Sequence, residues 1–217
     1  MEPKQIADIP ESYFQYRGDL VKPLFDGWFP NKLMTSIVPA LKKWDVGLAD
    51  VSWAPQATNL RDLQITFSVP KVNSAIRLGL DSITFDVANP DWTDAPIMME
   101  LLGTFVEALR SNLEFALAKQ EVAVAMHVRS SDPQMDEVMK GLVNESKLGP
   151  AEMYGVSVYR GDSACIIDKS LRYPSSYFIR LTRTFEASIG FSEVALSIYN
   201  DEVAALGLLG LTDFMRH

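Results

Sequence analysis

Hydrophobic and polar residues alternate along several stretches of this chain, a pattern typical of strands with one buried face. The clearest stretch is 63–69, where Leu63, Ile65, Phe67 and Val69 alternate with polar residues. The same alternation predicts strands at 12–17, 76–87, 121–129, 153–160, 164–168 and 190–199. Within 76–87 the apolar phase changes near Asp81, which indicates a bulge or a change of packing partner.

Other stretches have apolar residues every three or four positions, which predicts amphipathic helices. The longest is 94–118, with an apolar stripe made of Met98, Leu102, Phe105, Leu109 and Leu113. Shorter helices are predicted at 31–44, at about 132–142 and at 174–188. Pro39 lies inside the first of these, so that helix is expected to be kinked or to form two short turns.

These elements predict an α+β fold in which a mainly antiparallel sheet is covered by a long helix (about 94–118) and by shorter helices. Residues 1–10 contain two prolines and are expected to form a flexible arm, while 11–217 form a single domain. The apolar stretch 203–211 either completes the core or docks on another chain. The second alternative predicts a homo-oligomer.

A short repeat suggests internal duplication. Tyr-Arg-Gly-Asp occurs at 16–19 and again at 159–162, each time followed by an aromatic residue and a proline. The two segments 12–54 and 155–199 would then be pseudo-repeats with a ligand cleft between the halves. The alternative is a coincidence combined with ordinary turn chemistry, because Gly-Asp is also a common hairpin turn.

Composition and charge exclude several classes of function. The chain of 217 residues has a formal net charge of −8, whereas nonspecific nucleic-acid binding needs a basic surface. One cysteine and two histidines provide little material for a metal site, and we expect neither metal nor cofactor. No apolar run reaches the roughly 20 residues of a membrane span, and the first residues lack the core of a signal peptide. A cytoplasmic protein is the default prediction.

Three residues are candidates for catalysis. Gly161-Asp162-Ser163 resembles the Gly-Asp-Ser block of the lipase and esterase family named for it. The resemblance implies Ser163 as nucleophile, with Asp213 and His217 completing the site. Cys165 is a second candidate nucleophile, and His127 would activate it if their strands adjoin and share a face. Cys165 lies in an apolar strand, where a cysteine is commonly a small buried hydrophobe.

The sequence favours a non-enzymatic binding or interaction protein that uses a sheet face or a helix–sheet groove for a protein partner or an apolar small molecule. Small residues of 121–129, such as Ala123 and Ala125, would let something pack closely on one sheet face. The residues expected at the contact surface are Met98, Phe105, Met135, Met139, Leu206, Leu208 and Leu209. The alternative is a small hydrolase or transferase with its site near Asp162, Ser163 and Cys165.

Overall fold

A computed structural model describes residues 6–25, 30–53, 63–129, 137, 139–141, 155–211 and 213–216. Nine strands form one antiparallel sheet in the order β2-β3-β4-β5-β1-β6-β9-β8-β7. The strands are β1 (Ile6–Leu20), β2 (Val51–Trp53), β3 (Gln64–Val69), β4 (Ser74–Gly79), β5 (Ser82–Ala88), β6 (Leu117–Arg129), β7 (Gly155–Arg160), β8 (Ser163–Lys169) and β9 (Ser176–Glu186). A short tenth strand, β10 (Asp213–Arg216), pairs in parallel with the start of β1.

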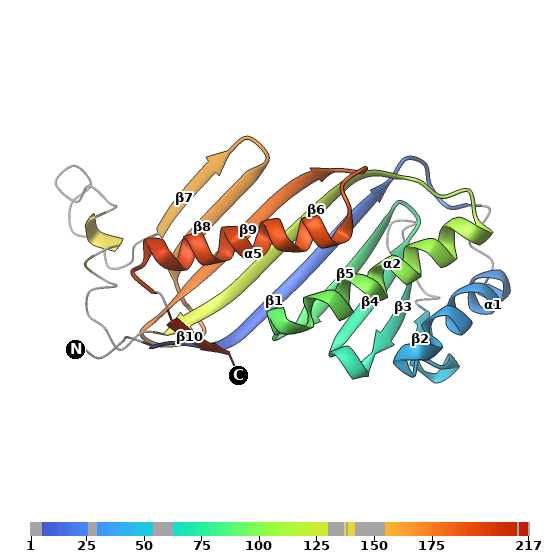
Figure 1. Ribbon diagram of the computed structural model, residues 1–217, viewed down its shortest axis with the longest axis horizontal. Helices are drawn as coiled ribbons and strands as arrows, with labels where there is room; N and C mark the ends of the chain where they lie inside the picture. Colours follow the sequence, from blue (N-terminus) through green and yellow to red (C-terminus); the bar gives the residue numbers. More distant parts are fainter. Residues whose placement is uncertain are drawn as a thin grey trace.

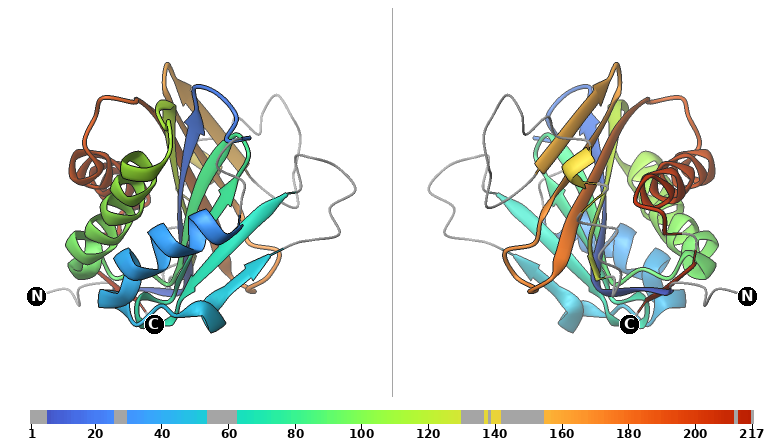
Figure 2. Two further views of the ribbon diagram at one scale, coloured as in Figure 1. Left: turned by 90° about the vertical axis from the view of Figure 1, so that its right-hand side faces the viewer. Right: turned by 90° about the vertical axis from the view of Figure 1, so that its left-hand side faces the viewer.

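Three helices lie on one face of this sheet (Figures 1 and 2). They are α1 (Pro30–Ala40), α2 (Ala95–Asn112) and α5 (Phe191–Leu208). In the described part of the chain no helix covers the opposite face, which we call the open face. None of the described helices has the length and apolar character needed to cross a membrane. The fold is therefore α+β, with a mainly antiparallel sheet as the sequence predicts.

The core lies between the helices and the covered face of the sheet. Strand residues that point toward the helices are aromatic or branched, because alternate positions of a strand share a face. Phe67 of β3 contacts Phe105 of α2 with ring centroids 5.4 Å apart, and both side chains are fully buried. Tyr16 of β1 contacts Phe191 of α5 at 5.5 Å. These contacts fix α2 and α5 on the same face.

A buried polar chain holds the start of α5 in place. The Tyr16 hydroxyl donates to Oε1 of Gln120 over 3.1 Å. The Gln120 amide in turn donates to the carbonyls of Glu186 and Ile189, each at 2.9 Å. Burial raises the pKa of Tyr16 far above its ordinary value, so this hydroxyl stays protonated and remains a donor.

Two predicted elements near the C-terminus have the wrong type. Residues 174–188, predicted as a helix, contain strand β9, and residues 190–199, predicted as a strand, begin helix α5. In β9 the buried residues Tyr177, Ile179 and Leu181 alternate with more exposed ones. In α5 the buried residues Val194 and Ile198 are four positions apart, which is the spacing of a helix face.

Other boundaries also differ from the sequence prediction. The helix predicted over 94–118 ends at Asn112, because Leu113 is extended and Leu117 already begins β6. The phase change near Asp81 is the turn between β4 and β5 rather than a bulge in one strand. Residues 6–10, predicted as part of a flexible arm, belong to β1, where the register shifts between Asp8 and Glu11 and so accommodates Pro10.

The structure gives the two halves of the proposed repeat different folds. The first Tyr-Arg-Gly-Asp lies inside β1, whereas the second ends β7 and forms the turn to β8. Helix α1 is the next element after the first copy, whereas strands β8 and β9 follow the second. Gly161 of the second copy has φ +54°, the left-handed conformation that a tight hairpin turn uses. The sequence match therefore has no counterpart in the arrangement of elements.

Candidate ligand groove on the open sheet face

The open face contains a groove of about 670 Å³ across its central strands. Small side chains form its floor on both sides of β1, because Ala88 of β5 and Ala125 of β6 both pair with Tyr13, and Ala123 of β6 pairs with Gln15. Larger residues form its rim, among them Arg77 on β4 and Phe178 and Arg180 on β9, while Tyr13 and Gln15 of β1 lie between the alanines. The volume falls within the range of small-molecule sites. The small residues predicted for this strand face thus leave a depression in the sheet.

The two arginines of the rim differ in their partners. Arg77 of β4 forms an ion pair with Asp86 of β5 at 2.7 Å, and Asp86 also accepts a hydrogen bond from Gln15. Arg180 of β9 is exposed and forms no hydrogen bond or ion pair with any residue that the structure describes. Its register partners, Ala125 and Ile166, have no polar side-chain group to offer it. Among the described residues that line the groove, Arg180 is therefore the cationic group available to a ligand.

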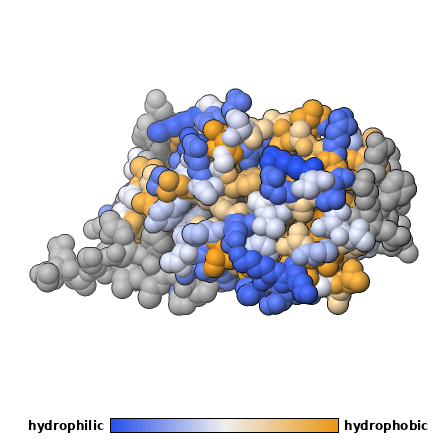
Figure 3. All heavy atoms as spheres, turned by 45° about the vertical axis from the view of Figure 1, so that its right-hand side comes forward, coloured by the Kyte–Doolittle hydropathy of each residue, from blue (hydrophilic) through white to orange (hydrophobic). Residues whose placement is uncertain are grey.

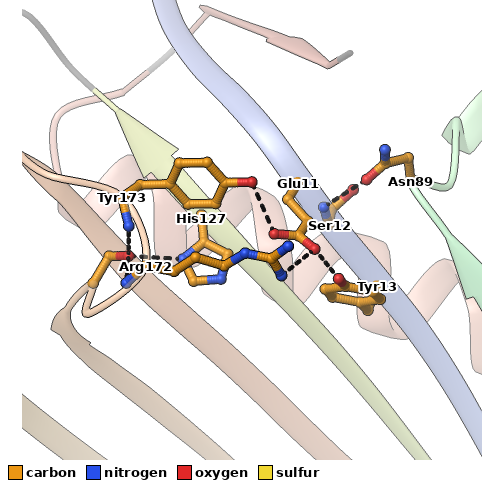
Figure 4. A network of polar contacts seen from close by, with 8 residues as sticks. Glu11, Ser12, Tyr13, Asn89, His127, Arg172 and Tyr173 are labelled. Carbon is orange, nitrogen blue, oxygen red and sulfur yellow. Dashed lines mark hydrogen bonds and ion pairs between the residues drawn. The ribbon is translucent and has the colours of Figure 1, made fainter.

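A polar network, shown in Figure 4, adjoins the groove at Tyr13. Its centre is the carboxylate of Glu11, a side chain that is 12% exposed. Arg172 forms an ion pair with this carboxylate at 2.6 Å, and the Tyr173 hydroxyl donates to it at 3.0 Å. The Tyr13 hydroxyl donates to the same carboxylate from the groove side. Glu11 thus connects the loop after β8 to strand β1, and its negative charge is balanced by Arg172.

His127 lies beside this network and connects to the same loop. Its Nδ1 is 3.0 Å from the hydroxyl oxygen of Ser170, which already accepts the backbone N–H groups of Arg172 and Tyr173. The Ser170 proton is therefore directed at His127, and Nδ1 is the acceptor. The imidazole packs between the rings of Tyr173 and Phe178, with centroid distances of 5.0 and 5.2 Å.

Burial, rather than the surrounding charges, favours the neutral form of His127. Burial lowers the pKa of His127, the nearby Glu11 carboxylate partly opposes this effect, and Arg172 adds to it. The hydrogen bond to Glu11 raises the pKa of the Tyr173 phenol. In this arrangement Ser170 is a turn residue that holds two backbone N–H groups. We therefore assign the network to positioning the loop beside the groove.

The structure does not bring His127 and Cys165 together. In the sheet register, Cys165 of β8 pairs with Leu181 of β9, and Leu181 pairs with Val124 of β6. Val124 is three positions from His127 on β6. Because successive side chains of a strand alternate between its faces, His127 lies on the open face and Cys165 on the covered face. Burial and the Asp201 carboxylate both raise the pKa of the Cys165 thiol, which disfavours the nucleophilic thiolate.

The residues of the Gly-Asp-Ser resemblance are also spread apart. Ser163 begins β8, and its hydroxyl donates to the carbonyl of Arg160 within the hairpin. The sheet register aligns Ser163 with Tyr16 near one end of β1, whereas Asp213 pairs with Ile6 near the other end. Ten strand positions separate those two ends of the register, about 33 Å at roughly 3.3 Å per residue. His217 lies outside the described residues.

Most residues predicted at a contact surface fill the core instead. The side chains of Met98, Phe105, Met139, Leu206 and Leu209 are each at most 3% exposed. Met98 and Phe105 lie on the buried face of α2, Leu206 lies on the buried face of α5, and Leu209 follows the end of α5. Met139 lies in a separate helical segment at 139–141. Leu208 is 66% exposed and borders a smaller apolar groove beside α5. Met135 lies outside the described residues.

Sequence reasoning missed Glu11, Ser170, Arg172, Tyr173 and Arg180. The alternation of apolar and polar residues around Arg180 could have identified β9 as a strand. That strand places Arg180 on the face opposite Ile179 and Leu181. The sequence offered no comparable sign for the loop residues, because Glu11 and Tyr173 are 162 positions apart and meet only through the sheet register.

Neither a protein-family model nor a curated protein matches this chain.

Proposed function

We propose that this protein is a non-enzymatic binding protein, and that the groove of the open face takes a small ligand with an anionic group on an apolar body. The observation that supports this proposal is Arg180, which stands beside an alanine floor and pairs with no residue that the structure describes. A guanidinium can bind a carboxylate or a phosphate through two parallel hydrogen bonds. The alanines and Phe178 provide the apolar contact.

Two features favour binding over catalysis. The acid–base groups in and beside the groove are engaged within the protein: Asp86 is held by Arg77 and Gln15, and Glu11 and His127 hold the loop. The alternative site around Asp162, Ser163 and Cys165 lies at the β7–β8 hairpin and on the covered face, where the raised pKa of Cys165 disfavours thiolate chemistry. A cytoplasmic location remains a prediction from composition.

The proposal is tested with three probes that share one aromatic body: 2-naphthoate, 2-naphthyl phosphate and the uncharged 2-naphthamide. We expect the protein to bind one or both anions at least 10-fold more tightly than the amide, measured by fluorescence titration. A preference between carboxylate and phosphate identifies the anionic group. Equal binding of the amide, or no binding of either anion, contradicts the proposal.

Two substitutions locate the binding site. Arg180→Gln should weaken binding of the preferred anion at least 10-fold, while Arg17→Gln should leave it unchanged. Arg17 is the matched control because it lies in β1 on the same open face of the sheet as Arg180 but is paired with Asp19 at 2.7 Å. Ala125→Leu should fill the floor and reduce binding of both anions. If Arg17→Gln weakens binding as much as Arg180→Gln, the anion binds elsewhere on the open face.

A further inference from the structure

Helix α5 turns an apolar surface outward, away from the sheet. Leu196, Val203 and Leu208 are 60%, 43% and 66% exposed. Leu196, Asn200 and Val203 follow the i, i+4, i+7 spacing, so they form one stripe along the helix. The exposed residues Ala204 and Gly207 widen this stripe with small side chains. We call the surface formed by these residues the α5 ridge.

The charged residues of α5 do not interrupt the ridge. Glu202 is fully buried and accepts a hydrogen bond of 2.6 Å from the Trp92 indole, which fixes the rotation of the helix about its axis. Asp201 is paired with Arg183 at 3.2 Å. Glu193 lies in the first turn, near the positive end of the helix dipole. The helix contains no lysine or arginine.

A groove flanks each half of the ridge. Beside the first half, a groove of about 450 Å³ lies between α5 and the start of α2, lined by Trp92, Pro96, Met99, Leu196 and Tyr199. Beside the second half, an apolar groove of about 240 Å³ lies between α5 and β7–β8, lined mainly by Val156, Val158, Cys165, Ala204 and Leu208. The molecule thus presents a ridge together with depressions that a similar ridge can enter.

We propose that the α5 ridge is the interface of a homodimer, in which the ridges of two copies pack across a twofold axis near Asn200. A twofold axis places the same patch on both subunits, so the patch must be complementary to itself. Ridge and groove in one molecule satisfy this condition by shape. Asn200 satisfies it chemically, because its amide has both a donor and an acceptor for the amide of the second copy.

The ridge is a place where two acidic copies can meet with little charge repulsion. Each chain has a net charge of −8, so most of its surface repels another copy. The ridge is uncharged between Glu193 and the end of α5, apart from the engaged Asp201 and Glu202. On the face that Figure 3 shows, hydrophobic residues form patches separated by hydrophilic ones, and the outer surface of α2 includes Glu100, Glu107 and Arg110.

The size of the surface matches a dimer interface. An 18-residue helix is about 27 Å long, and the helix with half a groove on each side is about 25 Å wide, which gives on the order of 700 Å². A stable interface typically buries about 800 Å² on each partner. This inference is independent of the ligand groove, which lies on the opposite face of the sheet.

Sedimentation equilibrium of the full chain between about 1 and 100 μM tests the proposal. We expect a mass of twice 24.2 kDa for the natural sequence. Leu196→Glu and Val203→Glu should each weaken dimerisation at least 30-fold. Leu48→Glu should leave it unchanged, because Leu48 is 69% exposed but lies outside α5. A monomer throughout, or a dimer that Leu196→Glu does not weaken, overturns the proposal.

Crosslinking gives a second test that does not depend on a disruptive charge. In a Cys165→Ser background, Asn200→Cys should form a disulfide-linked dimer under mild oxidation, since a twofold axis near position 200 brings the two cysteines together. Leu48→Cys in the same background is the control and should stay monomeric on a non-reducing gel. Equal crosslinking of the two variants overturns the proposed axis, whatever the mass measurement shows.

Discussion

The two faces of the sheet have different kinds of side chain, although the same strands form both faces. On the covered face, residues such as Phe67, Ile76 and Phe85 are fully buried and pack against the helices. On the open face, alanines lie beside arginines, carboxylates and tyrosines, and several of these groups are held by hydrogen bonds. Alternation along each strand separates apolar packing from polar recognition, so substitutions on the two faces should have different consequences.

The largest expected effect is on the covered face. Phe105→Ala should lower the free energy of unfolding by about 3–5 kcal/mol, because it leaves a cavity against Phe67 in a fully buried site. Thr182→Ala on the open face should cost less than about 1 kcal/mol. Urea unfolding of both variants measures the difference. Similar losses for the two variants would contradict the assignment of the core to one face.

The polar network should contribute a smaller amount. Glu11→Gln removes the ion pair with Arg172 and weakens the bonds from Tyr13 and Tyr173, so we expect a loss of about 1–3 kcal/mol. Glu121→Gln is the matched control, since its exposed pair with Lys119 at 3.7 Å should contribute less than about 0.5 kcal/mol. A neutral Glu11→Gln substitution would show that the network does not stabilise the fold.

His127 should make stability depend on pH. Its pKa is lowered in the folded protein, so the folded state binds fewer protons than the unfolded state. The stability that the neutral ring contributes is present above the ordinary value of 6.5 and is lost as the pH falls through the folded pKa. Unfolding between pH 7 and 5 should have a shallower pH dependence in His127→Asn. An NMR titration midpoint for His127 above 6.5 would contradict this.

The smallest effect concerns the thiol of the covered face. Because the pKa of Cys165 is raised, its modification by a disulfide reagent should be slow at pH 7 and should still accelerate above the ordinary value of 9.0. Asp201→Asn should increase the rate by less than about tenfold, since burial contributes more to the shift than this carboxylate does. Complete labelling within seconds at pH 7 would contradict this expectation and would support the hypothesis of a cysteine-based activity.

Alternation identified most strands because one face of each is buried and the other is not. The α+β class and the antiparallel sheet were predicted correctly, as was the Gly161-Asp162 turn. The failure at 174–199 has a specific cause. In α5 an inward Glu202 and an outward Leu196 reverse the usual amphipathic pattern, so the helix has a weak periodicity. In β9 both faces include aromatic residues, which obscures the alternation.

The candidate site was predicted less well than the fold. Ala123, Ala125 and His127 were recognised as one strand face, but their surroundings depend on pairing with β1, β5 and β9. Residues such as Glu11, Arg172 and Arg180 come from distant parts of the chain. Their contacts depend on the register, and a pattern along one strand does not specify the register of its neighbours.

The central position of β1 affects how the chain reaches this fold. Tyr16 pairs with Val122, 106 positions later, and Ile6 pairs with Asp213. The middle of the sheet is therefore assembled from distant segments, and closing such long loops slows folding. Until β6 pairs with β1 during folding, one edge of β1 has unpaired backbone groups that can pair with other chains. Slow refolding with concentration-dependent aggregation is the kinetic consequence of placing this strand at the centre.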